Sequence, residues 1–95
     1  MQSDAQSLGS VLRSLLRERG LHDITLEARV PHVWNEIVGE NASKHCTSVA
    51  MQSRVLSVQV DSSVWRSELR LRKDELRRRI NEQLGSNIVD DIQLR

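Results

Sequence analysis

Half of the basic residues of the chain lie in one segment, DSSVWRSELRLRKDELRRRINEQLG, at residues 61–85. The segment holds seven of the fourteen lysines and arginines, although the formal net charge of the 95-residue chain is only +1. Guanidinium and ammonium groups bind phosphate oxygens, so a cluster of them on one surface is typical of a nucleic-acid interface. The same pattern is also typical of the solvated outer face of a helix. The distinction depends on which of the seven side chains share a surface.

Four of the seven align along one side of a predicted helix. On a helical wheel, the apolar side that should face the core contains Trp65, Leu69, Leu76, Ile80 and Leu84. Beside this apolar stripe lies a row of four cations, which we call the basic ridge: Arg66, Arg70, Lys73 and Arg77. The ridge covers about 16 Å of helix, enough to reach several backbone phosphates. We predict that it binds nucleic acid, with Arg54 and Lys44 as weaker candidates.

The other basic residues of the segment are predicted to be compensated or to point elsewhere. Arg72 and Arg79 each follow a glutamate by four residues, which is the favourable order for an ion pair on a helix. Arg78 lies on the outer face. Within the ridge, only Arg70 has an acid one turn later, and that order is the poorer one. The predicted helix therefore has one balanced flank and one basic flank.

Other site chemistries find little support in the sequence. Three histidines and the single cysteine are spaced unlike any common zinc site, and they fall on different predicted elements: His22, His32, His45 and Cys46. The chain has no phosphate-cradling glycine-rich loop and no carboxylate pair at a predicted pocket. We therefore expect no metal, no cofactor and no enzymatic activity.

Aromatic residues are scarce, since the chain has two tryptophans and neither phenylalanine nor tyrosine. A conventional platform of several aromatic side chains for stacking single-stranded bases is therefore not available. Trp34 and Trp65 both lie on apolar stripes, and we expect both to pack in the core. Trp65 immediately precedes the basic ridge, so a partly exposed ring there would also be open to a partner.

The first part of the chain reads as helical. A helix is predicted at residues 8–19, with apolar residues at helical spacing, Ser7 as N-cap and Gly20 as its end. A second helix is predicted at residues 24–39, with a kink or restart at Pro31 because proline lacks the N–H donor. One more helical turn is expected at Asn41–His45.

The periodicity then changes to two. Strands are predicted at residues 47–52 and 54–61, joined by a turn at Ser53–Arg54. A long helix then runs to Leu84, capped by Asp61 or Ser62 at its start and by Gly85 at its end, and a third strand occupies residues 87–95.

This order, α-α-β-β-α-β, predicts an α+β fold with a small three-stranded mixed sheet and helices packed on one face. The third strand should run parallel to the second. The length indicates one domain spanning residues 1–95, with an ordered core at about residues 8–94. No apolar run approaches the length that crosses a bilayer, and the N-terminus lacks a signal pattern. We expect a cytoplasmic protein that makes no membrane contact.

Several motifs resemble the DciA-like family of small bacterial proteins. They are W-x-x-I-V-G at Trp34–Gly39, the alternating strand followed by Ser62 and Trp65, the helix end Ile80-Asn81-x-x-Leu84-Gly85, and a final isoleucine-rich strand. The resemblance covers roughly residues 8–95. It implies a single KH-like domain that binds DNA and the replicative helicase, and that helps the helicase load onto single strands. The glycine-flanked loop with which KH domains clamp a nucleic-acid backbone is absent, since Gly39 is followed by Glu-Asn-Ala.

Three functions remain open at this point. The first is a nucleic-acid-binding adaptor of DNA replication that favours single-stranded DNA. The second is a protein–protein interaction module in which the ridge meets an acidic partner, with the helix at residues 8–19 as an interface or a homodimer seam. The third is an RNA-binding KH-like protein, which the fold alone does not distinguish from the first.

Overall fold

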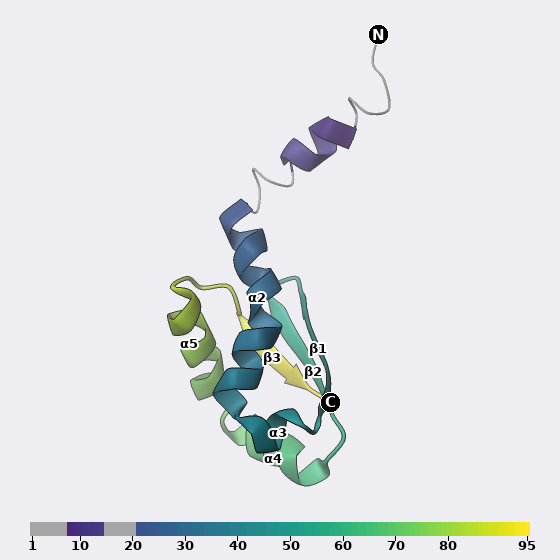
Figure 1. Cartoon of the computed structure of the whole chain (residues 1–95), viewed down its shortest axis with the longest axis vertical. Coiled ribbons are helices and arrows are strands. Elements are labelled where there is room, and N and C mark those ends of the chain that lie inside the picture. The colour runs from purple at the N-terminus through teal and green to yellow at the C-terminus, as the bar shows by residue number, and fades with distance from the viewer. Residues whose placement is uncertain (1–7, 15–20) are drawn as a thin grey trace.

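The computed structural model describes residues 8–14 and 21–95, and it has the predicted α+β order (Figure 1). After a helical segment at residues 8–14, the elements are α2 (Leu21–Val38), α3 (Glu40–Ser43), β1 (Cys46–Gln52), β2 (Val55–Val60), α4 (Ser63–Leu71), α5 (Lys73–Leu84) and β3 (Asp91–Leu94). Helix α3 is the extra helical turn expected near residue 41. The second half of the predicted first helix, with Gly20, lies outside the described residues. None of the helices described is both long and apolar enough to cross a lipid bilayer.

Helix α2 passes through Pro31 without restarting, so the predicted restart is wrong. Pro31 cannot donate a hydrogen bond to the preceding turn, which weakens the helix locally. The residues on both sides are fully buried, however: Val30 and Trp34 have no exposed surface and Val33 has 2%. Burying a large apolar side chain stabilises the fold by about 1.5–3 kcal/mol relative to leaving it exposed. The burial of these side chains therefore favours one continuous helix over an interruption at Pro31.

The hairpin forms where the alternating pattern predicts it. β1 and β2 pair antiparallel, with Gln52 opposite Val55, so the turn consists of Ser53 and Arg54. Both turn residues have positive φ, 51° and 66°, as a tight hairpin turn of matching twist requires. β1 begins at Cys46 rather than at residue 47, with an irregular register between Cys46 and Ser48.

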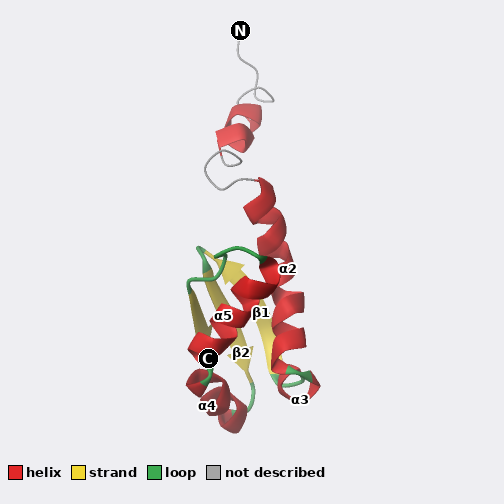
Figure 2. Cartoon of the chain, turned by 90° about the vertical axis from the view of Figure 1, so that its left-hand side faces the viewer, coloured by secondary structure: helices red, strands yellow, loops and turns green. Residues whose placement is uncertain are grey.

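β3 completes the sheet next to β2, in the order β1-β2-β3, and runs parallel to β2 as predicted. Figures 1 and 2 show α2 and α5 on one face of this sheet, with α3 and α4 at one end. β3 is shorter than predicted, Asp91–Leu94 instead of residues 87–95. The residues just before it, Ile88 and Val89, are nonetheless buried to 1% exposure.

The predicted long helix is in fact two helices, α4 and α5, which meet at Arg72. A straight helix from Ser63 to Leu84 would be about 33 Å long. The six-residue strand β2 that it must cover is only about 20 Å long. The break lets α4 cross the end of the sheet while α5 turns back over its face (Figure 1). Leu69 and Leu76, on opposite sides of the break, are therefore both completely buried.

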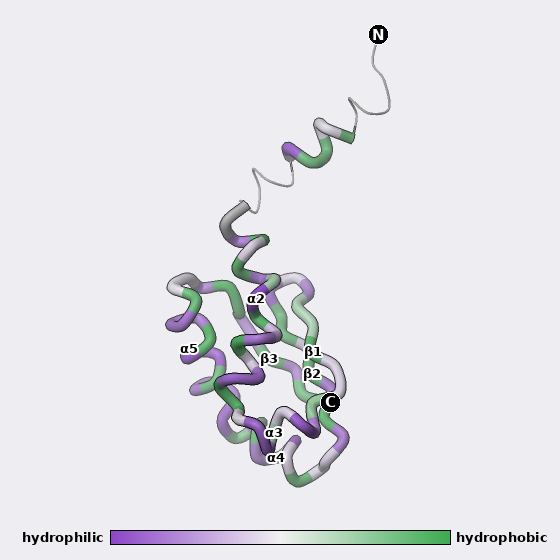
Figure 3. Tube along the Cα trace, in the orientation of Figure 1, coloured by the Kyte–Doolittle hydropathy of each residue, from purple (hydrophilic) through white to green (hydrophobic). Residues whose placement is uncertain are grey.

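Apart from Trp34, the buried core is aliphatic, as the scarcity of aromatic residues predicts. Four members of the predicted apolar stripe are buried, Leu69, Leu76, Ile80 and Leu84, whereas Trp65 is only partly buried. Along the trace, apolar residues alternate with polar ones on the strands and recur at every fourth position of the otherwise polar helix α5 (Figure 3). The apolar residues of these elements thus meet in one shared cluster.

One polar side chain, Asn81, is buried among these residues with 6% exposure. Its Oδ1 accepts hydrogen bonds from the backbone N–H groups of Ile88 and Val89, at 3.1 and 2.9 Å. Its Nδ2 donates to the Val89 carbonyl at 2.9 Å. The amide therefore satisfies three backbone groups of the segment that leads into β3, a role that periodicity alone does not reveal.

We predict that Asn81→Ala lowers the free energy of unfolding by about 2 kcal/mol, because it leaves the buried N–H and carbonyl of Val89 without their partner, whereas the Ile88 N–H keeps its second acceptor, the Ser86 carbonyl. Urea unfolding followed by circular dichroism measures the change. Asn35→Ala on α2, where the side chain is exposed, is the matched control and should change stability by less than about 0.5 kcal/mol. Equal losses in the two variants would contradict the role of the buried amide.

Candidate nucleic-acid interface

The basic ridge lies beside the ends of β2 and β3. Arg66 and Arg70 lie one turn apart on α4, and Lys73 and Arg77 lie one turn apart on α5. Three of the four side chains bond to residues at the end of β2 or within β3. The helix break at Arg72 therefore bends the ridge but keeps its members along one side of the molecule.

On α4, both arginines bond to backbone carbonyls of the sheet. Arg66 donates from Nη2 to the Val60 carbonyl at 2.7 Å, and its Nε is buried without a partner. Arg70 donates from Nη2 to the Leu94 carbonyl, also at 2.7 Å. β3 is an edge strand, so Arg70 covers a carbonyl that no neighbouring strand pairs. A guanidinium has five N–H donors, so each arginine keeps most of its hydrogen-bonding capacity.

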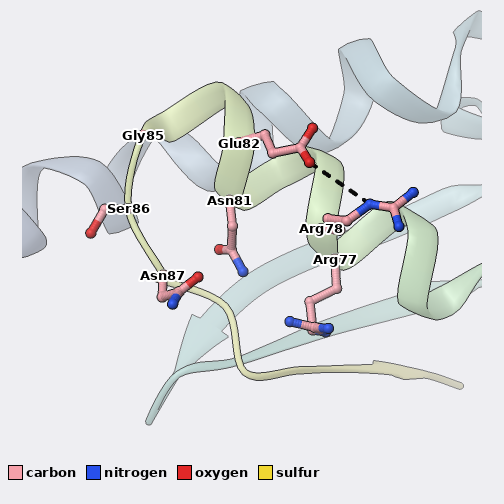
Figure 4. Close-up of a pocket in the computed structure, with 7 residues that line it drawn as sticks. All are labelled: Arg77, Arg78, Asn81, Glu82, Gly85, Ser86 and Asn87. Carbon is pink, nitrogen blue, oxygen red and sulfur yellow. Dashed lines mark ion pairs between the residues drawn. The ribbon is translucent and has the colours of Figure 1, made fainter.

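On α5, the two cations differ. Lys73 Nζ lies 2.9 Å from Asp91 Oδ1. Hydrogen bonds from Lys73 and from the Ile92 backbone N–H hold the pKa of Asp91 below its usual value. Arg77 forms no hydrogen bond or ion pair within residues 8–14 and 21–95, and it extends from α5 toward the segment that enters β3 (Figure 4). Arg77 is thus the ridge cation without a hydrogen-bond partner to displace among the described residues, although its charge helps to lower the pKa of Asp90 and the pKa of Asp91.

The ridge borders a shallow groove of about 540 Å³ along β3. Its walls are formed by Arg70, Lys73, Ile92, Gln93, Leu94 and Arg95. Three of these six residues are cationic, and Arg95 donates to Gln93 at 3.1 Å. Arg95 was not among the predicted site residues, because its position beside the ridge depends on the parallel pairing of β3 with β2. The groove therefore concentrates positive charge beyond the helix itself.

A second hollow, of about 390 Å³, lies at the C-terminal end of α5 (Figure 4). Arg77 and Asn81 line one part of it, and Ser86 and Asn87 follow the left-handed Gly85 at the helix end. The carbonyls at a helix C-terminus carry partial negative charge, so this hollow favours anions less than the groove does.

The acidic compensation of the other arginines differs from the prediction. No ion pair joins Glu68 to Arg72 or Glu75 to Arg79 in the described part of the chain, and Arg78 instead lies 3.8 Å from Glu82. The break at Arg72 interrupts the helical spacing that Glu68 needs. Exposed ion pairs of this kind also contribute only about 0–1 kcal/mol to stability, so the two side chains are not strongly held together.

Arg54, one of the weaker candidates, is already engaged. Its Nε lies 2.8 Å from Asp90 Oδ2, and its Nη2 donates to Asp90 Oδ1 at 3.2 Å and to the carbonyl of Asn87. Hydrogen bonding from this guanidinium holds the pKa of Asp90 below its ordinary value. Arg54 thereby fastens the hairpin turn to the segment before β3. Lys44, the other weaker candidate, is exposed just after α3.

The described histidines and the cysteine do not form a shared site. His32 lies 2.6 Å from Glu36 on α2, and His45 lies 2.8 Å from Asp61. Cys46 donates to the Ala42 carbonyl at 3.4 Å, and burial raises the pKa of its thiol. Among the residues whose side chains are described, which exclude His22, no group of three His, Cys, Asp or Glu is placed to share a metal ion.

Comparison with known proteins gives consistent matches over nearly the whole chain. The sequence model of a family described as "Dna[CI] antecedent, DciA" matches residues 7–94. A UPF0232 protein of Streptomyces avermitilis is 40% identical over 88 residues, which cover 90% of this chain and 49% of the relative. A UPF0232 protein of Mycobacterium ulcerans is 31% identical over 91 residues, 96% of this chain and 49% of the relative. The chain thus spans about half the length of these relatives, and no solved structure matches it.

The Arg54–Asp90 contact predicts a pH-dependent stability. Because the pKa of Asp90 is lower in the folded protein than its ordinary value of 3.8, the stabilisation is present above that value. It is lost as the pH falls through the lowered folded value. We predict that Asp90→Asn lowers the urea midpoint at about pH 7 and that the gap to the unmodified protein narrows toward about pH 3.

Glu68→Gln is the control for this measurement. Glu68 is an exposed residue on α4, and its carboxylate has no ion-pair partner among the described residues. It should leave the midpoint nearly unchanged at both pH values. A gap for Asp90→Asn that stays constant across the pH range would contradict the assignment.

Proposed function

The chain belongs to the DciA family, and from this membership we propose that it is a non-catalytic, nucleic-acid-binding adaptor of bacterial DNA replication. It binds single-stranded DNA through the basic ridge, and it binds the replicative helicase to assist its loading in the cytoplasm. The chain matches only about half the length of each relative, so the loading of the helicase is a proposal for this chain.

The observation that carries the DNA-binding proposal is the groove along β3. Arg70 lines it from α4, Lys73 from α5 and Arg95 from the position after β3, and Arg77 continues the same side of α5. Cations brought together by folding, rather than by their sequence spacing alone, form a surface that an extended phosphate backbone follows.

The proposed contacts are electrostatic. The arginines keep free N–H donors beside their bonds to the sheet, so a phosphate can bind without disrupting β3. Lys73 must share its charge between Asp91 and a phosphate, which makes its contact the weaker one. The proposed contacts are with phosphates, which carry no base information, so we expect binding that depends little on base sequence.

We predict that replacing Arg70, Lys73 and Arg77 together by alanine flattens the salt dependence of single-stranded DNA binding by about 2 units of log Kd against log salt. Fluorescence anisotropy with a labelled oligonucleotide, titrated at several salt concentrations, measures this slope.

The matched control replaces three cations from the same helical region outside the ridge, Arg72, Arg78 and Arg79, by alanine. It removes the same formal charge. If the ridge is the site, this control keeps most of the slope, whereas an equal flattening in both variants would show only non-specific attraction. Duplex DNA and RNA in parallel titrations establish which nucleic acid the ridge prefers.

A second candidate function, a protein–protein interaction module, is favoured by exposed apolar residues. On α4, Val64 and Leu71 lie about two turns apart with 76% and 84% exposure. In the helical segment at residues 8–14, Leu8, Val11 and Leu12 are 57–70% exposed. Apolar side chains that are exposed together on one helix face are candidates for a surface that a partner covers. Leu15 and Leu16, which complete the predicted interface, lie outside the described residues.

We predict that Val64→Ser with Leu71→Ser weakens capture of the replicative helicase and leaves single-stranded DNA binding unchanged. A pull-down after nuclease treatment measures capture, and anisotropy measures DNA binding. The Arg70, Lys73 and Arg77 variant should show the opposite pattern. The interaction module would be favoured by two results together: the ridge variant no longer captures the helicase, and the unmodified protein binds no DNA.

A further inference from the structure

We propose that His45 and Trp65 together form a stacking platform for one unpaired nucleobase at the α4 end of the basic ridge. The inference rests on the proposed function, because it states how the same nucleic-acid strand is recognised beyond its phosphates. A chain with two tryptophans and no other large aromatic residue lacks a conventional platform. Folding supplies the second ring from a histidine.

The two rings come from segments that are distant in the sequence. His45 precedes β1, and Trp65 lies in the first turn of α4; Figure 2 shows α3 and α4 at the same end of the sheet. The ring centroids are 6.4 Å apart and the ring planes differ by 25°, which is a stacked arrangement. Near-parallel aromatic rings of this kind present a flat surface that suits a base of any type.

Trp65 is the fixed part of the platform. Its indole is partly buried and packs against the core. Its backbone N–H donates to Ser62 Oγ at 3.2 Å, which is the N-cap contact of α4. The position of the ring is therefore set by the core and by the start of the helix.

His45 is the accessible part. Its Nδ1 lies 2.8 Å from Asp61 Oδ1, and its carbonyl accepts a hydrogen bond from the Asp61 backbone N–H at 2.9 Å. Even so, 42% of its side-chain surface is exposed. A ring held at one edge by a carboxylate and supported by a second ring loses little conformational freedom when a base stacks on it.

The platform adjoins cations on both sides in the sequence. Lys44 is exposed and directly precedes His45, and Arg66 directly follows Trp65 as the first residue of the ridge. The phosphates that flank a stacked base would thus have cationic side chains nearby. A duplex keeps its bases stacked on one another, so this site discriminates in favour of single strands.

Two ligands of equal length separate base stacking from phosphate binding. One is a short oligodeoxythymidylate, and the other is the corresponding abasic oligonucleotide, which has the same phosphates and no bases. We expect the unmodified protein to bind oligodeoxythymidylate about 5-fold or more tightly than the abasic strand, as one stacked base would give.

His45→Ala should abolish this preference and leave abasic binding unchanged. His32→Ala is the matched control, because the His32 side chain is 80% exposed on α2 and lies outside the platform. It should keep the preference. A urea midpoint for each variant verifies that the fold is intact.

Tryptophan fluorescence provides a second readout. Trp34 is completely buried, so quenching by bound oligodeoxythymidylate reports on Trp65. The quenching should be lost in Trp65→Phe, which keeps an aromatic ring and therefore most of the affinity.

The outcomes distinguish this inference from the proposed function. Equal affinity for the two oligonucleotides overturns the platform and leaves ridge binding intact. A His45→Ala variant that weakens both ligands equally also overturns it, since that pattern indicates a structural role for His45. Binding of neither ligand overturns both proposals.

Discussion

A buried amide connects the end of α5 to the sheet. Asn81 bonds to three backbone groups of Ile88 and Val89, and without it the buried N–H and carbonyl of Val89 would lack a partner. This contact sets the path by which the chain leaves α5 and enters β3. Asp90 and Asp91 follow immediately, and they meet Arg54 of the hairpin and Lys73 of α5. The position of β3 beside the basic ridge therefore depends on a side chain that faces the interior.

The open edge of β3 gives the ridge a second role. An unpaired edge strand exposes backbone groups that attract other strands, and proteins commonly cover such edges with charged side chains. Arg70 covers the Leu94 carbonyl, and Asp91 accepts from the Ile92 backbone N–H while pairing with Lys73. The cations proposed to contact phosphates thus also shield the sheet, and their removal affects both properties. Lysine at position 70 would preserve the charge but lose the planar arrangement of donors.

Local periodicity is enough to predict the order of the elements and the hairpin turn at Ser53–Arg54. A general rule of chain connection is enough to predict that the third strand is parallel to the second. The grouping of the ridge on one side could also be predicted, since i, i+4 spacing holds within α4 and within α5. The helix break at Arg72 could not, because it reflects the length of the sheet rather than any local signal. The groove contribution of Arg95 and the stacking of His45 on Trp65 depend on contacts between distant segments.

The hairpin turn has a consequence for the order in which the chain folds. Ser53 and Arg54 both adopt left-handed backbone conformations, which cost about 1–2 kcal/mol each for residues with a Cβ. Glycine at position 54 would relieve the strain there, but it would remove the guanidinium that bonds to Asp90 and to the Asn87 carbonyl. The compensation for the strained turn is thus located more than thirty residues later in the sequence. During synthesis the hairpin can pair early, but it acquires its full stability only after residues 87–90 have been made and docked.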